Sequence, residues 1–165
     1  RDPEMSRGLG DVYKRQQKNN MRVKVIGDIT AFDSDIQESI EKLEDFSKDF
    51  TDLHFQIALN YGSRDEMVRA MRHMADDLSS GNLSKDEITE EVFNGYLDTK
   101  ELPDPDLMIR TSGELRLSNY LLWQLAYTEF YFTDVYWPDF NREELIKACE
   151  KYNKRERRYG GVKEE

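Results

Sequence analysis

The chain has 165 residues, which suits a single domain, and its 24 basic and 34 acidic residues give a formal net charge of −10. This acidic balance argues against nucleic acid as a partner, because binding to a phosphate backbone needs a basic surface. The single cysteine, Cys149, excludes an internal disulfide and fits a reducing compartment, and no apolar run approaches the ~20 residues of a transmembrane helix.

The first segment, residues 1–18, is expected to be a leader unrelated to the rest of the chain, either disordered or artefactual. Its first 16 residues, RDPEMSRGLGDVYKRQ, follow neither the period of a strand nor that of a helix. They have the character of a cloning or assembly scar, and a disordered native tail is the alternative. Neither interpretation assigns any chemistry to this segment.

From Asn19 onwards, strand-like and helix-like patterns alternate. The predicted strands are residues 22–26, 53–59, 107–110 and 130–133. The predicted helices are residues 34–50, 63–78, 84–97, 119–127 and 141–152, and the pairs Ser34/Gln37, Ser63/Glu66, Ser84/Glu87 and Asn141/Glu144 are predicted to cap four of them. Such alternation predicts an α/β fold, a parallel sheet with helices on both faces.

Apolar side chains in the predicted helices indicate which faces pack inward. In residues 63–78 the predicted inward face is Met67, Val68, Met71, Ala75 and Leu78, and in the last helix it is Leu145, Ile146, Cys149 and Tyr152. Cys149 is therefore expected in the core. His54 and His73 have no partners at ligand spacing and are expected to be structural or exposed, and Asn60–Arg64 is expected to be a tight turn with a helix cap rather than an anion site.

The stretch from Asp104 to Phe140 carries the strongest functional signal. Its apolar run Leu107–Ile109 predicts a buried strand, and Arg110 then falls at the carboxyl end, where open α/β sheets bind ligands. Arg116 follows, and Ser118 occupies the expected N-cap of the next helix. Two guanidinium groups beside a helix N-terminus would cradle a diphosphate through bidentate donors, free backbone N–H groups and a favourable dipole.

The segment IRTSGELRLSNYLLWQLAYTEFYFTDVYWPDF resembles the signature segment of the cis-prenyltransferases, and is most similar to bacterial undecaprenyl diphosphate synthases, the isoprenyl transferases. RVKVIGD, ALNYGSRDEMVRA and LPDPDLMIRTSGE resemble further family segments in the expected order, so that residues 19–161 are similar to the carboxyl-terminal portion of an isoprenyl transferase domain. Residues 162–165 would form an acidic tail.

The resemblance implies that Arg110, Arg116 and Ser118 hold the diphosphate of isopentenyl diphosphate. Leu117 would donate its backbone N–H, and Glu114 would orient the two arginines. Without the resemblance, such spacing is common by chance, and a solvated loop whose arginines pair with Glu114 and Asp106 would explain it. Leu115 departs from the family pattern, which usually has a polar residue or methionine there, and its side chain is expected to point away from the diphosphate.

Glu129 would be a Mg²⁺ ligand, as the resemblance implies, sharing the ion with a second carboxylate. Mg²⁺ is usually bound by one or two carboxylates together with substrate phosphates and waters, so one local glutamate suffices chemically. The alternative is an ordinary surface glutamate at the edge of a strand. The chain contains no Asp-Gly-Asn-Gly-Arg motif and no serine–glutamate–asparagine segment of the family. The catalytic residues are therefore expected outside this chain, which would be truncated at the N-terminus.

The resemblance also implies partners and a location. Family enzymes are homodimers, and the aromatic run from Phe130 to Trp137 would serve the interface as well as the core. The basic tail Arg157–Gly161 would reach a diphosphate across the dimer, or else be a frayed end. The expected localisation is cytoplasmic, with peripheral contact at the inner face of the membrane for product delivery.

The function implied is condensation of isopentenyl diphosphate with an allylic prenyl diphosphate to make a cis-polyprenyl diphosphate, an undecaprenyl-type lipid carrier. This chain is expected to bind diphosphate weakly and to be inactive alone. The alternative from another class is a non-catalytic scaffold subunit of a prenyltransferase complex, and a third is a generic phosphate-binding α/β module. Restoring the family's opening segment would rescue activity only in an enzyme.

Overall fold

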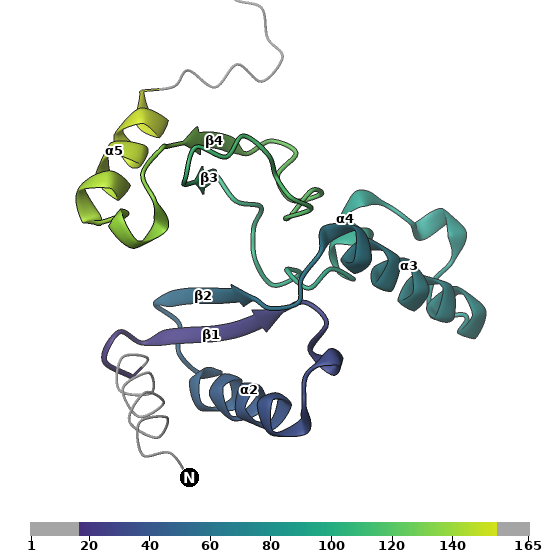
Figure 1. Ribbon diagram of the computed structural model, residues 1–165. Helices are drawn as coiled ribbons and strands as arrows, with labels where there is room; N and C mark the ends of the chain where they lie inside the picture. The colour runs from purple at the N-terminus through teal and green to yellow at the C-terminus, as the bar shows by residue number, and fades with distance from the viewer. Residues whose placement is uncertain (1–16, 155–165) are drawn as a thin grey trace, which may run out of the picture. The chain divides into compact units, whose positions relative to one another are not determined.

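The computed structural model describes residues 17–154 and divides into two compact units, Arg1–Glu101 and Leu102–Glu165 (Figure 1). Each unit contains one two-stranded parallel sheet. The segments 1–16 and 155–165 lie outside the described residues. The predictions for most of the leader, for the basic tail at 157–161 and for the acidic tail at 162–165 therefore fall outside the described part of the chain.

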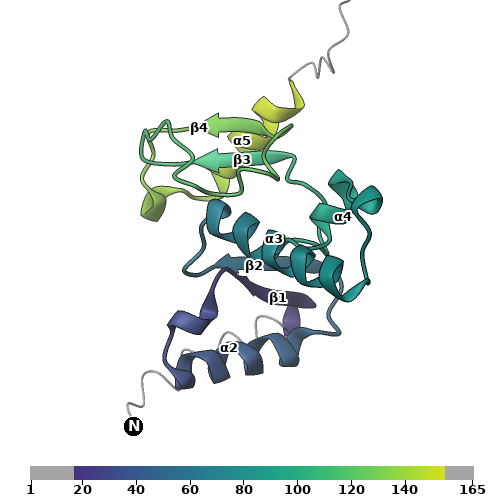
Figure 2. The same cartoon turned by 90° about the vertical axis from the view of Figure 1, so that its right-hand side faces the viewer.

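The first unit is built on β1 (Met21–Ile26) and β2 (Leu53–Ala58), which pair in parallel with Met21 opposite Leu53. The helix α2 (Ser34–Ser47) lies against β1, as Figure 2 shows, and α3 (Ser63–Ser80) follows β2. The single-turn helices η1 (Ile29–Ala31) and η2 (Lys85–Glu87) and the short α4 (Glu90–Asn94) complete the unit. Its most buried apolar side chains are Val23, Ile26, Ile40, Ala70, Met74 and Leu97.

The second unit is built on β3 (Leu107–Arg110) and β4 (Glu129–Phe132), which pair in parallel with Leu107 opposite Glu129. A long segment of turns joins the two strands, and η3 (Trp137–Asp139) and α5 (Arg142–Asn153) follow β4. Met108, Leu125 and Ala148 are its buried apolar side chains. No helix of the described residues combines the length and the apolarity that a bilayer-spanning segment requires.

The predicted fold class is confirmed, since parallel strands and helices make up both units. The strands lie in two separate pairs, however, whereas their alternation with helices predicted one sheet. Hydrophobic periodicity identifies a strand but contains no information about which strands are neighbours.

The predicted helix at 119–127 is wrong. Ser118, Asn119 and Leu121 have φ values of 51°, 61° and 45°, in the left-handed region that interrupts an α-helix. The backbone bonds Tyr120 N–H to Leu117 O and Ala126 N–H to Trp123 O span three residues, as in turns. Part of this apolar segment is nevertheless buried, since Leu125 is 5% exposed. Its apolar side chains therefore pack from turns rather than from one face of a helix.

The predicted helix at 84–97 is also wrong as a continuous element. The capping pair Ser84/Glu87 is present, and the Ser84 N–H donates to Glu87 Oε2 at 2.8 Å, but it caps only the single turn η2. Ile88 leaves the helical path, and Thr89 starts α4 with its hydroxyl accepting the Val92 N–H at 3.2 Å. A second cap within six residues therefore divides the segment.

Two other predicted caps are displaced by one residue. The N-cap of α2 is Asp33 rather than Ser34, and that of α3 is Gly62 rather than Ser63. The cap of α5 is confirmed, because Asn141 Oδ1 accepts the N–H groups of Glu143 and Glu144 at 2.9 and 3.2 Å.

The inward faces of two helices differ from the predicted ones. In α3 the buried residues are Ser63, Glu66, Ala70 and Met74, whereas Val68, Met71 and Leu78 are 39%, 54% and 38% exposed. In α5 the buried residue is Ala148, and Cys149 is exposed, so the prediction of a core cysteine is wrong. Small or hydrogen-bonded side chains occupy the close contacts in both helices, and a pattern based on apolar residues alone does not find them.

Candidate functional site

The loop that follows β3 is fixed against the segment that follows β4. The Ser112 N–H donates to Val135 O and the Gly113 N–H to Thr133 O, each at 2.9 Å, while the Thr133 N–H donates to Arg110 O at 3.0 Å. Gly113 has a φ of +67°, and a Cβ there would lie 2.9 Å from Asp134 Oδ1. The backbone is therefore held at the carboxyl ends of both strands, which is where parallel sheets bind ligands.

Arg110 and Arg116 both belong to this region of the second unit. Arg110 is the last residue of β3, opposite Phe132, and its side chain is partly exposed. Arg116 is paired with Glu114 through Nη1 and Oε2, and the Arg116 side chain remains 65% exposed. Glu114 thus forms an ion pair with Arg116, and its role in orienting the two arginines stays a prediction. Within residues 17–154, Arg110 makes no ion pair, so its guanidinium can accept an anionic ligand.

Leu117 and Ser118 continue the loop, but they do not start a helix. Leu117 O accepts the Tyr120 N–H at 3.1 Å in a turn, and Ser118 is exposed with a positive φ. The predicted helix dipole behind the diphosphate is therefore absent from this part of the described chain. What remains for an anion is the pair of guanidinium groups, the Ser118 hydroxyl and the backbone N–H groups of the loop.

Glu129 is at the other end of the strand pair. It opens β4 opposite Leu107, and its N–H donates to Asp106 O at 3.1 Å. Three residues of parallel strand separate this level from that of Arg110, a backbone distance of about 10 Å. Among the described residues no three histidine, cysteine, aspartate or glutamate side chains form a metal-binding group. Glu129 therefore provides only part of a Mg²⁺ site. Phosphate oxygens or a second carboxylate would have to supply the remaining ligands.

A buried charged cluster in the first unit was not predicted as such. Glu66 is 1% exposed, accepts the Tyr61 hydroxyl at 2.5 Å and accepts the Asp98 N–H at 2.9 Å. The Asp98 carboxylate accepts both Arg69 Nη groups, at 3.0 and 2.8 Å, and the Gly27 N–H at 2.9 Å. These bonds tie the carboxyl ends of β1 and β2 to α3 and to the segment after α4.

The surroundings of this cluster raise two pKa values. Burial and then the Glu66 carboxylate raise the pKa of Tyr61, and the hydrogen bonds from Arg69 to Asp98 raise the pKa of Arg69. Both shifts keep Tyr61 and Arg69 in their ordinary protonation states at neutral pH. A glutamate in the first turn of a helix is usually a cap, which is why the sequence pattern assigned Glu66 that role.

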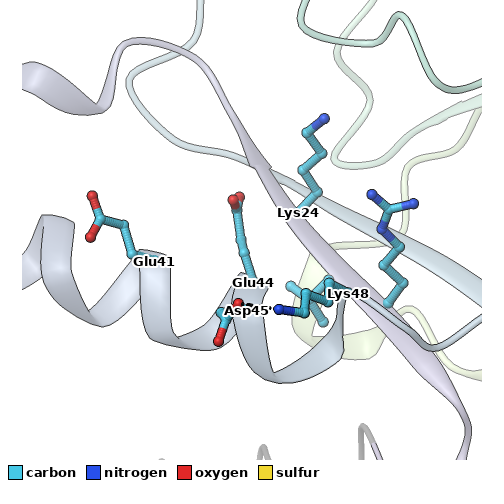
Figure 3. Close-up of a pocket in the computed structure, with 7 residues that line it drawn as sticks. Lys24, Glu41, Glu44, Asp45 and Lys48 are labelled. Atoms are coloured by element: carbon cyan, nitrogen blue, oxygen red, sulfur yellow. Dashed lines mark hydrogen bonds and ion pairs between the residues drawn. The ribbon is translucent and has the colours of Figure 1, made fainter.

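A cavity of about 340 Å³ lies between α2 and β1 (Figure 3). Its lining is almost wholly charged: Arg22, Val23, Lys24, Glu41, Glu44, Asp45 and Lys48. None of these residues was predicted to bind a diphosphate. The basic residues that line the cavity already have acidic partners: Lys48 pairs with Asp45 at 2.8 Å, and Arg22 and Lys24 pair with Glu101. We therefore assign the candidate site to the arginine loop of the second unit, defined as Arg110 and the residues up to Ser118, because Arg110 is partly exposed and Arg116 is exposed there.

The predicted site residues lie in two places in the second unit. Arg110 ends β3, the segment after it carries Glu114, Arg116, Leu117 and Ser118, and Glu129 starts β4. His54 and His73, which were expected to be structural or exposed, are both exposed.

The family model Prenyltransf, described as "Putative undecaprenyl diphosphate synthase", matches residues 5–160. This range begins inside the segment that we expected to be an unrelated leader, and the boundary at residue 18 stays a prediction. An isoprenyl transferase of Bacillus cereus is 47% identical over 154 residues, which are 93% of this chain and 60% of that protein. Another from Halalkalibacterium halodurans is 50% identical over 145 residues. The chain spans about 60% of the length of these curated relatives.

Two crystal structures extend the similarity to the fold. A lavandulyl diphosphate synthase from Lavandula x intermedia, in complex with dimethylallyl diphosphate, matches with a TM-score of 0.87 and 37% identity over 92% of this chain and 65% of that one. A probable undecaprenyl diphosphate synthase from Campylobacter jejuni matches with a TM-score of 0.80 and 33% identity over 95% of this chain and 71% of that one.

Proposed function

The chain belongs to the undecaprenyl diphosphate synthase family of prenyltransferases, and on that premise we propose that the whole protein is an isoprenyl transferase. The proposed reaction joins isopentenyl diphosphate to an allylic prenyl diphosphate and makes a cis-polyprenyl diphosphate, a lipid carrier of the undecaprenyl type. The names of the relatives from Bacillus cereus and Campylobacter jejuni support this assignment.

The observation that carries the proposal is the exposed arginine loop at the carboxyl ends of β3 and β4. Guanidinium groups present planar, bidentate donors that match phosphate oxygens better than a lysine ammonium does. Arg110 and Arg116, with the Ser118 hydroxyl and the Leu117 N–H, would bind the diphosphate of isopentenyl diphosphate. Glu114 holds Arg116 by an ion pair, which limits the motion that binding would otherwise have to arrest.

The allylic substrate would bind beside this half-site. Negative charge develops on the allylic diphosphate as it leaves, so preorganised cationic donors accelerate the step. That the lavandulyl diphosphate synthase was crystallised with dimethylallyl diphosphate, itself an allylic diphosphate, supports this substrate class. The catalytic residues themselves are proposed to lie outside residues 1–165.

Mg²⁺ is the proposed cofactor, with Glu129 as one ligand. The ion would neutralise diphosphate charge when bound. Because Glu129 supplies a single carboxylate, the ion would need phosphate oxygens or a second carboxylate to complete its coordination. Replacing Glu129 by Gln is therefore expected to weaken the Mg²⁺ dependence of diphosphate binding while leaving metal-free binding unchanged.

A homodimer is proposed, with exposed aromatic residues after β4 at its interface. Tyr136 and Trp137 are 66% and 73% exposed, and the Trp137 ring stacks on Phe140 with centroids 6.3 Å apart. Large aromatic side chains of this kind are enriched at interfaces. A cytoplasmic location, with peripheral contact at the membrane for product delivery, is proposed from the chemistry of the lipid product.

A chimera tests the assignment. The segment of the Bacillus cereus relative that this chain does not match is fused ahead of Asn19, and incorporation of radiolabelled isopentenyl diphosphate is measured. We expect elongation by the chimera, none by residues 1–165 alone, and none by the chimera carrying Arg110→Ala and Arg116→Ala. Elongation by residues 1–165 alone would contradict the proposed inactivity of the isolated chain.

A non-catalytic scaffold subunit is the second candidate function. It predicts that the chimera stays inactive. The retained Arg110, Glu114 and Arg116 favour the enzyme, because a scaffold has no need of exposed guanidinium groups at a sheet end.

A further inference from the structure

The outer edge of β1 faces α2 rather than another strand. The Leu59 N–H donates to Ile26 O at 3.0 Å, so the backbone of Ile26 faces β2. Since N–H and C=O groups alternate sides along a strand, the N–H groups of Val23 and Val25 point away from β2. In an edge strand these donors would be open to pairing with another chain.

Side chains of α2 accept both of these donors. The Val23 N–H donates to Ser47 Oγ at 3.0 Å, and the Val25 N–H donates to Glu44 Oε1 at 2.6 Å. Ser47 is 0% exposed, and its hydroxyl also lies 3.4 Å from Val23 O. In Figure 3, Glu44 extends from α2 towards β1, one helical turn beyond Glu41. The helix thus takes the hydrogen-bonding place of a third strand.

The charges of β1 itself protect this edge only in part. Lysine or arginine on an edge strand commonly discourages pairing, because a second chain would have to bury the charge. Here Arg22 and Lys24 share one carboxylate, that of Glu101, at 3.0 and 3.5 Å, which offsets part of their charge. The β-branched residues Val23 and Val25 would favour strand addition if their N–H groups were released.

We propose that Glu44 and Ser47 seal the outer edge of β1 against pairing with a strand of a second copy of this chain. Addition of a strand there requires both side-chain bonds to break and the Glu44 carboxylate to move aside. The seal restricts growth of this sheet to the side of β2. It is independent of the diphosphate site, which lies on the second unit.

Amide hydrogen exchange of the full 165-residue chain tests the seal. Glu44→Ala is compared with Glu41→Ala, a matched loss of one carboxylate from the same helix and the same cavity. We expect Glu44→Ala to speed exchange at the Val25 amide about tenfold, as loss of a hydrogen bond to a charged acceptor implies, with no change at the Ala70 amide of α3. Equal exchange at Val25 in the two variants, or equal acceleration at Ala70, would overturn the proposal.

Sedimentation velocity tests the consequence for association. The Glu44→Ala/Ser47→Ala double variant is expected to form larger species than the parent chain does. The fraction of protein in these larger species should rise with protein concentration. Glu41→Ala should sediment as the parent does. A double variant with fast exchange at Val23 and Val25 that still sediments like the parent at every concentration would show that the bonds do not control association.

Discussion

One charged cluster of the first unit and the arginine loop of the second unit differ in how far their charged side chains are buried. In the first unit, Glu66 is 1% exposed, and the Arg69 guanidinium is bonded to Asp98 through both Nη groups. In the second unit, Arg116 is 65% exposed and has one acidic partner, and Arg110 is the terminal residue of its strand. Buried, fully bonded charges fix a scaffold, whereas exposed guanidinium groups on a pinned loop are available to a ligand.

This difference predicts which substitutions lower the stability of the fold and which lower the affinity for a ligand. Changes to the buried cluster leave donors or acceptors buried without their partners, at a cost of several kcal/mol. Changes to the exposed loop remove groups that water solvates well, so their effect on folding is small. The predictions below test that separation, beginning with the largest effect.

Gly27→Ala should cost the most stability. Gly27 has a φ of +112°, and a Cβ there would lie 2.1 Å from Leu59 O, so the ends of β1 and β2 would have to separate. We expect a loss of about 3–5 kcal/mol in the free energy of unfolding, measured by urea denaturation. Gly81→Ala is the matched control, because its φ is +80° but nothing lies within 4 Å of a Cβ, and it should cost only about 1 kcal/mol. Equal losses in the two variants would contradict the crowding at Gly27.

Glu66→Ala should be the next most damaging change. It removes the acceptor of the Tyr61 hydroxyl and of the Asp98 N–H, and we expect a loss of about 2–4 kcal/mol in urea denaturation. Glu38→Ala, which breaks the exposed pair of Glu38 with Lys42, should change stability by no more than about 0.5 kcal/mol. A Glu66 variant as stable as the Glu38 variant would mean that the buried cluster does not support the first unit.

Arg116→Lys is expected to act on binding alone. Lysine keeps the charge but loses the planar pair of donors, so affinity for isopentenyl diphosphate should fall about three- to tenfold, measured by calorimetric titration. Thermal unfolding should be unchanged, because the side chain is largely exposed. Arg142→Lys, at an exposed arginine of the same unit, is the control. A lowered unfolding temperature with unaltered affinity would place Arg116 in the scaffold instead.

The smallest effect concerns the dependence of stability on pH at Asp77. Hydrogen bonds from the Tyr96 hydroxyl, at 2.6 Å, and from Asn82 hold the pKa of the Asp77 carboxyl below its usual range. A folded-state pKa that is lowered contributes stability above the unfolded pKa, and this contribution is lost as the pH falls through the folded value. Tyr96→Phe should therefore lessen the loss of stability on acidification below about pH 4. Tyr127→Phe, at a side chain 91% exposed, should leave the acid profile unaltered.

The strands and the start of α5 could be predicted because local chemistry determines them. The apolar run Leu107–Ile109 between prolines and Gly113 indicated β3, and Asn141 capped α5 as expected. The arginine loop could be predicted for the same reason, since Arg110 directly follows a buried strand. The pairing of β1 with β2 and of β3 with β4 is a long-range property that no local pattern contains.

The failures have physical causes in particular residues. The run Tyr120–Trp123 has the composition of a helix, but the left-handed conformations of Ser118, Asn119 and Leu121 turn it into a series of bends. The face of α3 was predicted one position away from the true one, because Ser63 and Glu66 are buried through hydrogen bonds rather than apolarity. The seal on β1 depends on Glu44 and Ser47, which sequence alone shows only as polar residues of an amphipathic helix.

The central claim is that the exposed arginine loop binds a diphosphate. Calorimetric titration of isopentenyl diphosphate into the 165-residue chain, with Mg²⁺ present, tests it most directly. The account predicts that Arg110→Ala/Arg116→Ala lowers the affinity at least tenfold, at unchanged unfolding temperature, while Arg142→Ala binds as the parent does. An affinity of the double variant equal to that of the parent chain would contradict the account.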